Sequence, residues 1–169
     1  MKAKILKRDI FPVAPTSFAV AINHDGKVDK RFLTLPRLGI YVISSGRQII
    51  RLGECSSGAR RFRDGFCGRL RIMRRGKERK NYAAYSWRDN YRASSVTVDY
   101  FELPEAFDNN ALRRALEAEL TFQLRIAKRR WPRDMSEIHF LERYRKNTAV
   151  VKQLRRILTH YRLRYNDGI

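Results

Sequence analysis

One glutamate of this chain stands where a carboxylate needs a partner. Residues 111–130 have the spacing of a helix, and at about 100° per residue one face of it is apolar. That face contains Leu112, Leu116, Leu120, Phe122 and Ile126. Glu119 falls inside this arc, near its centre, whereas Glu117 lies well outside it. A carboxylate facing the core is costly unless it is paired or bound to a metal. Glu119 is therefore predicted either to pair with an arginine or to hold a divalent cation, and Glu117 is the second candidate.

The charge of the chain points to a polyanionic partner. Thirty-seven Lys and Arg against seventeen Asp and Glu give a net charge of +20 over 169 residues, and 43% of the residues are hydrophobic. Such a chain can form a core, and a folded domain tolerates this self-repulsion most easily when a polyanion binds it. Arginine far outnumbers lysine, and its guanidinium fork matches phosphate oxygens and guanine edges. Nucleic acid is therefore the expected class of partner.

The stretch 67–92 is predicted to be irregular, and its part 69–80 is predicted to contact phosphates. The loop 69–80 is too basic and too poor in apolar residues to belong to a core. Its predicted DNA-binding residues are Arg69, Arg71, Arg74, Arg75 and Lys77. Exposed cations of this kind supply the sequence-independent part of DNA binding.

Other site classes find little support in the sequence. Cys55 and Cys67 lack a second pair of metal ligands, and the three histidines are scattered. Both cysteines are interpreted as reduced thiols of a cytoplasmic protein. No window of eighteen apolar residues predicts a membrane span, and the N-terminus lacks the apolar stretch of a secretory signal.

The expected elements give an α/β or α+β fold with a small, mainly antiparallel sheet flanked by helices. Strands are predicted at 18–23, 38–43, 48–52 and 96–103, with turns at 24–27 and 44–47. Residues 55–66 are predicted as a turn leading into a short basic helix. Asn109 or Asn110 is expected to cap the helix at 111–130, which ends before Pro132, and a helix or helical pair follows at 136–163.

A single domain over 1–169 is expected. It divides into a β extension at 1–36, a core at 38–132 and a helical extension at 133–169.

Residues 38–132 resemble the GIY-YIG nuclease family. The strands at 38–43 and 48–52 are predicted to form a hairpin. Gly39-Ile40-Tyr41 lies in its first strand and Arg51-Leu52-Gly53 ends its second, and Arg61 follows eight residues after Gly53. The family has a GIY strand, a YIG strand about ten residues later, an arginine on the next helix and an acidic residue on a helix after the third strand. The polar turn after Gly53 and the helix at 111–130 also match that arrangement.

The resemblance implies a role for each matched residue. Tyr41 would be the general base near the attacking water, a role in which the cations Arg51 and Arg61 would favour its phenolate form. Arg61 would hold the scissile phosphate, and Glu119 would bind the divalent cation, Mg²⁺ or another such as Mn²⁺. Arg51 replaces the second tyrosine of the family and can contribute only charge, because an arginine does not act as a base.

Two further departures from the family pattern concern its polar residues. Gly65 stands where the nucleases commonly carry Tyr or His, so that Tyr82 or Tyr85 would have to substitute for it. The asparagine that often follows the helix-ending proline is not found after Pro132.

The resulting expectation is a metal-dependent endonuclease that cuts double-stranded DNA at specific sites, as type II restriction enzymes of the family do, and acts as a homodimer. A DNA-repair or phage-encoded nuclease is the alternative among enzymes. A basic nucleic-acid-binding module that has lost catalysis is the alternative outside them.

Overall fold

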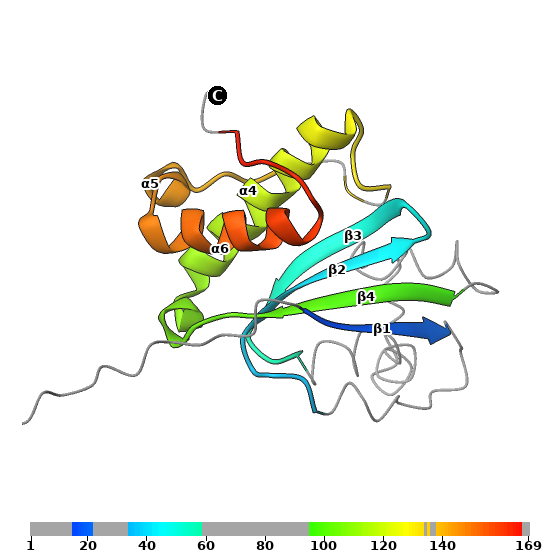
Figure 1. Ribbon diagram of the computed structural model, residues 1–169. Coiled ribbons are helices and arrows are strands. Elements are labelled where there is room, and N and C mark those ends of the chain that lie inside the picture. The colour runs from blue at the N-terminus through cyan, green and yellow to red at the C-terminus, as the bar shows by residue number, and fades with distance from the viewer. Residues whose placement is uncertain (1–14, 22–33, 59–94, 134, 136–137, 167–169) are drawn as a thin grey trace, which may run out of the picture.

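The computed structural model describes residues 15–21, 34–58, 95–133, 135 and 138–166 (Figure 1). In chain order its elements are β1 (Thr16–Ala21), β2 (Gly39–Ser45), β3 (Gln48–Cys55), β4 (Ser95–Glu102), the 3₁₀ turn η3 (Glu105–Asp108), α4 (Asn110–Lys128), α5 (Glu142–Arg145) and α6 (Thr148–His160). The strands pair antiparallel in one sheet, in the order β1-β4-β2-β3. With helices flanking this sheet, the predicted α+β fold class is confirmed.

The hairpin of β2 and β3 forms where the sequence predicts it and extends further at both strands. Ser45 pairs with Gln48, so Gly46 and Arg47 alone make the turn. Gly46 adopts φ 55°, a positive value that two-residue hairpin turns require and that glycine adopts without steric cost. The register shifts after Ile43, and Ile50 becomes an extra residue on β3. This β-bulge lies immediately beside Arg51.

Strand β1 joins the same sheet as the hairpin by pairing with β4. Thr16 lies opposite Tyr100 and Ala21 opposite Ser95. The predicted strand at 18–23 is thus observed about two residues earlier, and the predicted turn at 24–27 lies outside the described residues. The N-terminal segment is consequently part of the central sheet of the protein.

The sheet has two distinct faces because alternate side chains of a strand point in opposite directions. Ile40 and Val42 of β2, with Leu52 of β3, pack into one core with the helices; we call this side the helix face. Figure 1 shows α4 and α6 over this side of the sheet. The opposite side carries Tyr41, Ile43, Arg51, Gly53 and Tyr100; we call it the tyrosine face.

Helices α4 and α6 begin in the same way. The side chain of Asn109 accepts hydrogen bonds from the backbone N–H groups of Ala111 and Leu112, at 2.8 and 3.4 Å. Asn147 does the same for Ala149 and Val150, at 3.0 and 3.4 Å. Both side chains satisfy backbone donors that a helix start leaves unpaired. Of the two caps predicted for α4, Asn109 is the one observed.

The C-terminal helices share their core with the sheet. The predicted helical segment at 136–163 is a pair, α5 and α6, and the buried side of α6 has helical spacing: Val150, Leu154, Ile157 and Leu158. These side chains pack with Leu116, Leu120 and Leu124 of α4. Deleting a buried leucine from such a cluster typically costs about 2–5 kcal/mol. The predicted extension is thus a layer of the core.

Candidate active site

The hairpin brings Tyr41 and Arg51 to the same face of the sheet. Tyr41 lies opposite Gly53, and Arg51 lies opposite Ile43. The two residues are therefore diagonal neighbours on the tyrosine face, a relation that typically separates them by about 7–8 Å and is within reach of long side chains. This is the juxtaposition that the resemblance predicts for the first and second tripeptides.

The glycines of both tripeptides make room for tyrosine rings. A Cβ atom added at Gly53 would lie 2.7 Å from Cζ of Tyr41, and one added at Gly39 would lie 2.7 Å from Cε1 of Tyr100. Tyr41 thus reaches across from β2 and rests on the backbone of β3, and only 6% of its surface is exposed. The spacing Gly-Ile-Tyr and Arg-Leu-Gly therefore has a packing reason in addition to any catalytic one.

Tyr100 is a structural member of this face. Its hydroxyl donates to the carbonyl oxygen of Pro36 at 2.8 Å and lies 3.5 Å from the Sγ atom of Cys55. Burial, reinforced by Cys55 and Glu102, raises the pKa of the Tyr100 phenol above its ordinary value. Tyr100 therefore stays protonated at neutral pH. The buried thiol of Cys55 in turn donates to the carbonyl oxygen of Gly39.

Glu119 is buried as predicted, with 3% of its surface exposed. Its partner is an arginine: Oε1 of Glu119 lies 2.6 Å from Nε of Arg145 in α5. The hydrogen bond to Glu119 is the main cause that raises the pKa of the Arg145 guanidinium. Of the two partners that the sequence left open, this one satisfies the carboxylate without a metal.

Glu119 does not lie with Tyr41 and Arg51. Helix α4 packs on the helix face, where its Leu116 and Leu120 belong to the same buried cluster as Ile40, whereas Tyr41 and Arg51 are on the other face. On α4 itself, Glu119 points toward α5, where Arg145 meets it. The predicted grouping of these three residues into one site is therefore not observed, because the sheet lies between them.

Glu117 lies on a different flank of α4. It follows Arg113 by one helical turn, and Nε of Arg113 contacts Oε2 of Glu54 on β3 at 2.7 Å. Positions four apart share one side of a helix, whereas Glu117 and Glu119 are about 160° apart. Glu117 therefore shares a flank of α4 with Arg113, which contacts β3, and it is partly exposed.

Arg113 is a buried residue that the sequence analysis did not single out. Besides Glu54, its Nη1 atom donates to the carbonyl oxygens of Phe107 and Asp108 at 2.7 and 2.8 Å. It thereby ties β3 and η3 to the first turn of α4. The only sequence signal was its place beside Leu112 and Leu116, where the hydrophobic pattern predicts partial burial.

A second polar cluster surrounds Asp99 on the helix face. Its two carboxylate oxygens accept hydrogen bonds from the hydroxyls of Ser17 and Tyr161, at 2.6 and 2.7 Å, and His160 Nε2 lies 4.0 Å away. Burial, and then the charge of Asp99, raise the pKa of Tyr161. This cluster joins β1, β4 and the end of α6, and its satisfied hydrogen bonds indicate a structural role.

The remaining predicted site residues cannot be placed on this framework. Arg61, Arg69, Arg71, Arg74, Arg75 and Lys77 lie outside the described residues, as do Gly65, Cys67, Tyr82 and Tyr85. Among the residues that the structure does describe, no three His, Cys, Asp or Glu side chains gather as a metal-binding group. In the same part of the chain, no helix has the length and apolar character needed to cross a membrane.

Comparison with known proteins adds no relative to these observations. No family model, no curated protein and no solved structure matches the chain. The resemblance to the GIY-YIG nucleases consequently rests on the residues of the sequence alone.

Proposed function

We propose that this protein is a divalent-cation-dependent endonuclease that hydrolyses phosphodiester bonds of double-stranded DNA. The observation that carries the proposal is the register of β2 and β3, which makes Tyr41 and Arg51 neighbours on the tyrosine face. The net charge of +20 supports a polyanionic substrate. Both features are independent of Glu119, whose position does not support a part in the same site.

The chemistry divides between these two residues. A water oxygen attacks phosphorus while Tyr41, as phenolate, takes the water proton, and the bond from phosphorus to the leaving oxygen breaks. The leaving oxygen receives a proton from solvent. Arg51 favours the phenolate and offsets the charge that develops on the phosphoryl oxygens. A bound Mg²⁺ would supply further charge stabilisation at the phosphate.

The acid that would hold the cation is better sought at Glu117 than at Glu119. A hard cation that acts on DNA is held by oxygen ligands at a position that solvent and substrate can reach. The Glu119 carboxylate is buried and already neutralised by Arg145 at 2.6 Å, so it does not fit that role. Glu117 is partly exposed and shares a flank of α4 with Arg113, which contacts β3. This position suits a ligand beside the hairpin.

Plasmid cleavage tests the proposal. The purified protein with Mg²⁺ should linearise or nick plasmid DNA, and EDTA should stop the reaction. Tyr41→Phe should lower the rate by about 10²–10⁴-fold, the usual contribution of general-base assistance. Tyr144→Phe, which removes a hydroxyl from a partly buried tyrosine of α5, is the matched control. Rates within a few-fold of the parent for Tyr41→Phe, with the fold intact by circular dichroism, would make Tyr41 a packing residue only.

A second pair of variants identifies the acid. Glu117→Gln should abolish cutting and leave DNA binding unchanged, whereas Glu119→Gln should retain cutting and lose stability. Loss of cutting in a folded Glu119→Gln protein, with full activity in Glu117→Gln, would return the metal site to Glu119. Normal cutting by both would remove α4 from the active site altogether.

Site-specific cleavage by a homodimer, as in type II restriction, is the form of the activity that we propose. Discrete fragments from a long DNA would support it, and random fragments would favour a repair-type or phage-encoded nuclease. The burial of Tyr41 and the pairing of Glu119 favour one alternative outside catalysis, a nucleic-acid-binding module. Tight DNA binding without cleavage under any divalent cation would establish that alternative.

A further inference from the structure

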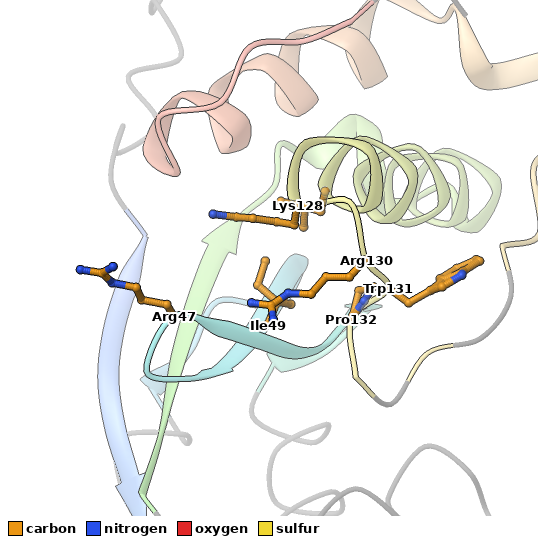
Figure 2. A pocket seen from close by; sticks show the side chains of 7 residues that line it. Arg47, Ile49, Lys128, Arg130, Trp131 and Pro132 are labelled. Carbon is orange, nitrogen blue, oxygen red and sulfur yellow. The ribbon is translucent and has the colours of Figure 1, made fainter.

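An open basic hollow lies at the end of the sheet, far from Tyr41 along the hairpin. It is lined by Arg47, Ile49, Leu124, Lys128, Arg130, Trp131 and Pro132 (Figure 2). Arg47 comes from the β2–β3 turn, Lys128 from the last turn of α4, and Arg130 from the segment that follows. Figure 2 shows Arg47 and Lys128 extending toward the same side, with the Arg130 side chain lying beside Ile49.

The lining carries three cations and no acid. Within the part of the chain that the structure describes, Arg47, Lys128 and Arg130 form no ion pair with a carboxylate, and all three are exposed. The carbonyl end of α4 contributes about half a negative charge, which favours cations there. One cation would offset that dipole, and the other two leave the hollow positive. Such a cluster is self-repulsive in the free protein and favourable beside an anion.

The walls of the hollow are held in place before any ligand binds. The N–H of Arg133 donates to the carbonyl oxygen of Ile49 at 3.1 Å, which fastens the segment after α4 to β3. The Trp131 ring is packed against the guanidinium of Arg125, with 4.2 Å between Cζ and the ring centroid. Less conformational entropy is therefore lost when this surface binds than for a cluster on a flexible chain.

We infer that this hollow seats a backbone phosphate of bound nucleic acid. Its polar side-chain groups are all donors, three of them cationic, which suits a phosphodiester oxygen. The hollow would be a DNA contact of the proposed nuclease, and only the identity of the ligand as DNA depends on that proposed function. The predicted contacts at 69–80 do not include these residues.

The position of the hollow relative to the candidate active site is compatible with one DNA strand that contacts both. Ile49 and Gly53 are four residues apart on β3, about 13 Å in an extended strand. This equals the rise of about four base pairs, 3.4 Å each, along the axis of the DNA helix. The hollow lies on the helix face and Arg51 on the tyrosine face, but both border β3, which is at one end of the described sheet. A backbone that passes along this edge could therefore contact both. The hollow would thus fix the register of the DNA at the reacting phosphate.

The test measures binding without cleavage. Fluorescence anisotropy of a labelled 20-base-pair DNA in EDTA, over a range of salt concentrations, compares the parent with Arg47→Ala/Lys128→Ala. One lost phosphate contact should make the slope of log K against log[salt] about 0.9 less steep and weaken binding by about 10-fold near 100 mM salt. The control Arg114→Ala/Lys152→Ala removes the same charge from exposed positions on α4 and α6, and its slope should stay within error of the parent.

A second readout comes from Trp131. The chain has two tryptophans, so Trp87→Phe leaves Trp131 as the reporter, and DNA should change its emission in that variant but not after Arg47→Ala/Lys128→Ala is added.

The failures are distinguishable. If both double variants bind DNA with the salt slope of the parent, the hollow does not contact phosphate, and the proposed nuclease activity is unaffected. If Arg47→Ala/Lys128→Ala has a less steep slope but the parent cuts no plasmid, the phosphate contact stands and the nuclease proposal is rejected. Equal losses in the two double variants would mean that only net charge matters, which also overturns the hollow. Binding to phosphatidylserine vesicles that needs Arg47 and Lys128, with DNA affinity unaffected, would assign the surface to a membrane instead.

Discussion

The ion pair between Glu119 and Arg145 should respond very differently to the loss of either partner. The Glu119 side chain is 4% exposed and the Arg145 side chain 27% exposed. Arg145→Met leaves a buried carboxylate with no counter-charge, and breaking a buried pair in this way costs about 3–5 kcal/mol. The exposed contact of Arg145 with Glu142 at 3.5 Å adds at most about 1 kcal/mol. Stacking of Arg145 on Phe140 at 4.6 Å adds about 0.5–1 kcal/mol.

Glu119→Leu should cost much less than Arg145→Met. The arginine that remains is partly exposed, can be hydrated, and keeps Glu142 as a neighbour. We expect a loss at the low end of the range of about 1.5–3 kcal/mol for a hydrogen bond to a charged group. The double variant Glu119→Leu/Arg145→Met should be close to Glu119→Leu alone, because a buried pair replaced by apolar residues is often nearly neutral.

Urea unfolding followed by circular dichroism at pH 7.5 measures all three variants on one scale. If Arg145→Met is too unstable to purify, recovery of a folded protein by adding Glu119→Leu tests the same asymmetry. A loss below about 1 kcal/mol for Arg145→Met would refute the reasoning, since a buried carboxylate cannot lose its counter-charge so cheaply. So would a rise in the parent's midpoint with Mn²⁺ that disappears in Glu119→Gln, because this would make Glu119 a metal ligand.

Three further changes test the packing and the backbone. Gly53→Ala places a methyl group 2.7 Å from Cζ of Tyr41 and should cost about 1–3 kcal/mol by overpacking; an unchanged urea midpoint would contradict the contact. Burial raises the pKa of Tyr161 above its ordinary 10.0, so the folded state retains this proton and loses stability as the pH rises above about 10. Tyr161→Phe should reduce that alkaline loss by about 1.4 kcal/mol per pH unit. Urea unfolding at pH 9, 10 and 11 measures it, and the same dependence of the free energy of unfolding on pH in parent and variant would rule out the raised pKa. Arg129 caps α4 with φ 52°, a left-handed conformation that favours glycine, so Arg129→Gly should raise stability by about 0.5–1 kcal/mol; a lower melting temperature would argue against strain there.

Local patterns were sufficient to predict the elements around the candidate site. The polar turn after Ile43 set the hairpin, because two β-rich runs separated by a glycine-containing turn close on each other. Asn109 set the start of α4, because its side chain can accept from the free N–H groups of a first turn. The 3.6-residue period also placed Glu119 in the core, and it is buried. These features depend on neighbours within a few residues, which the sequence specifies directly.

The partners of these residues depended on the path of the chain. Which of the many arginines reaches Glu119 is decided by the turn that brings α5 back along α4, and the Arg145 partner is 26 residues away. The same path makes α6 part of the core and puts β1 beside β4. Helical period alone gives an angle around α4 and says nothing about which side faces the sheet. Only the tertiary structure therefore separates Glu119 from Tyr41 and Arg51 and brings Arg47 to Lys128.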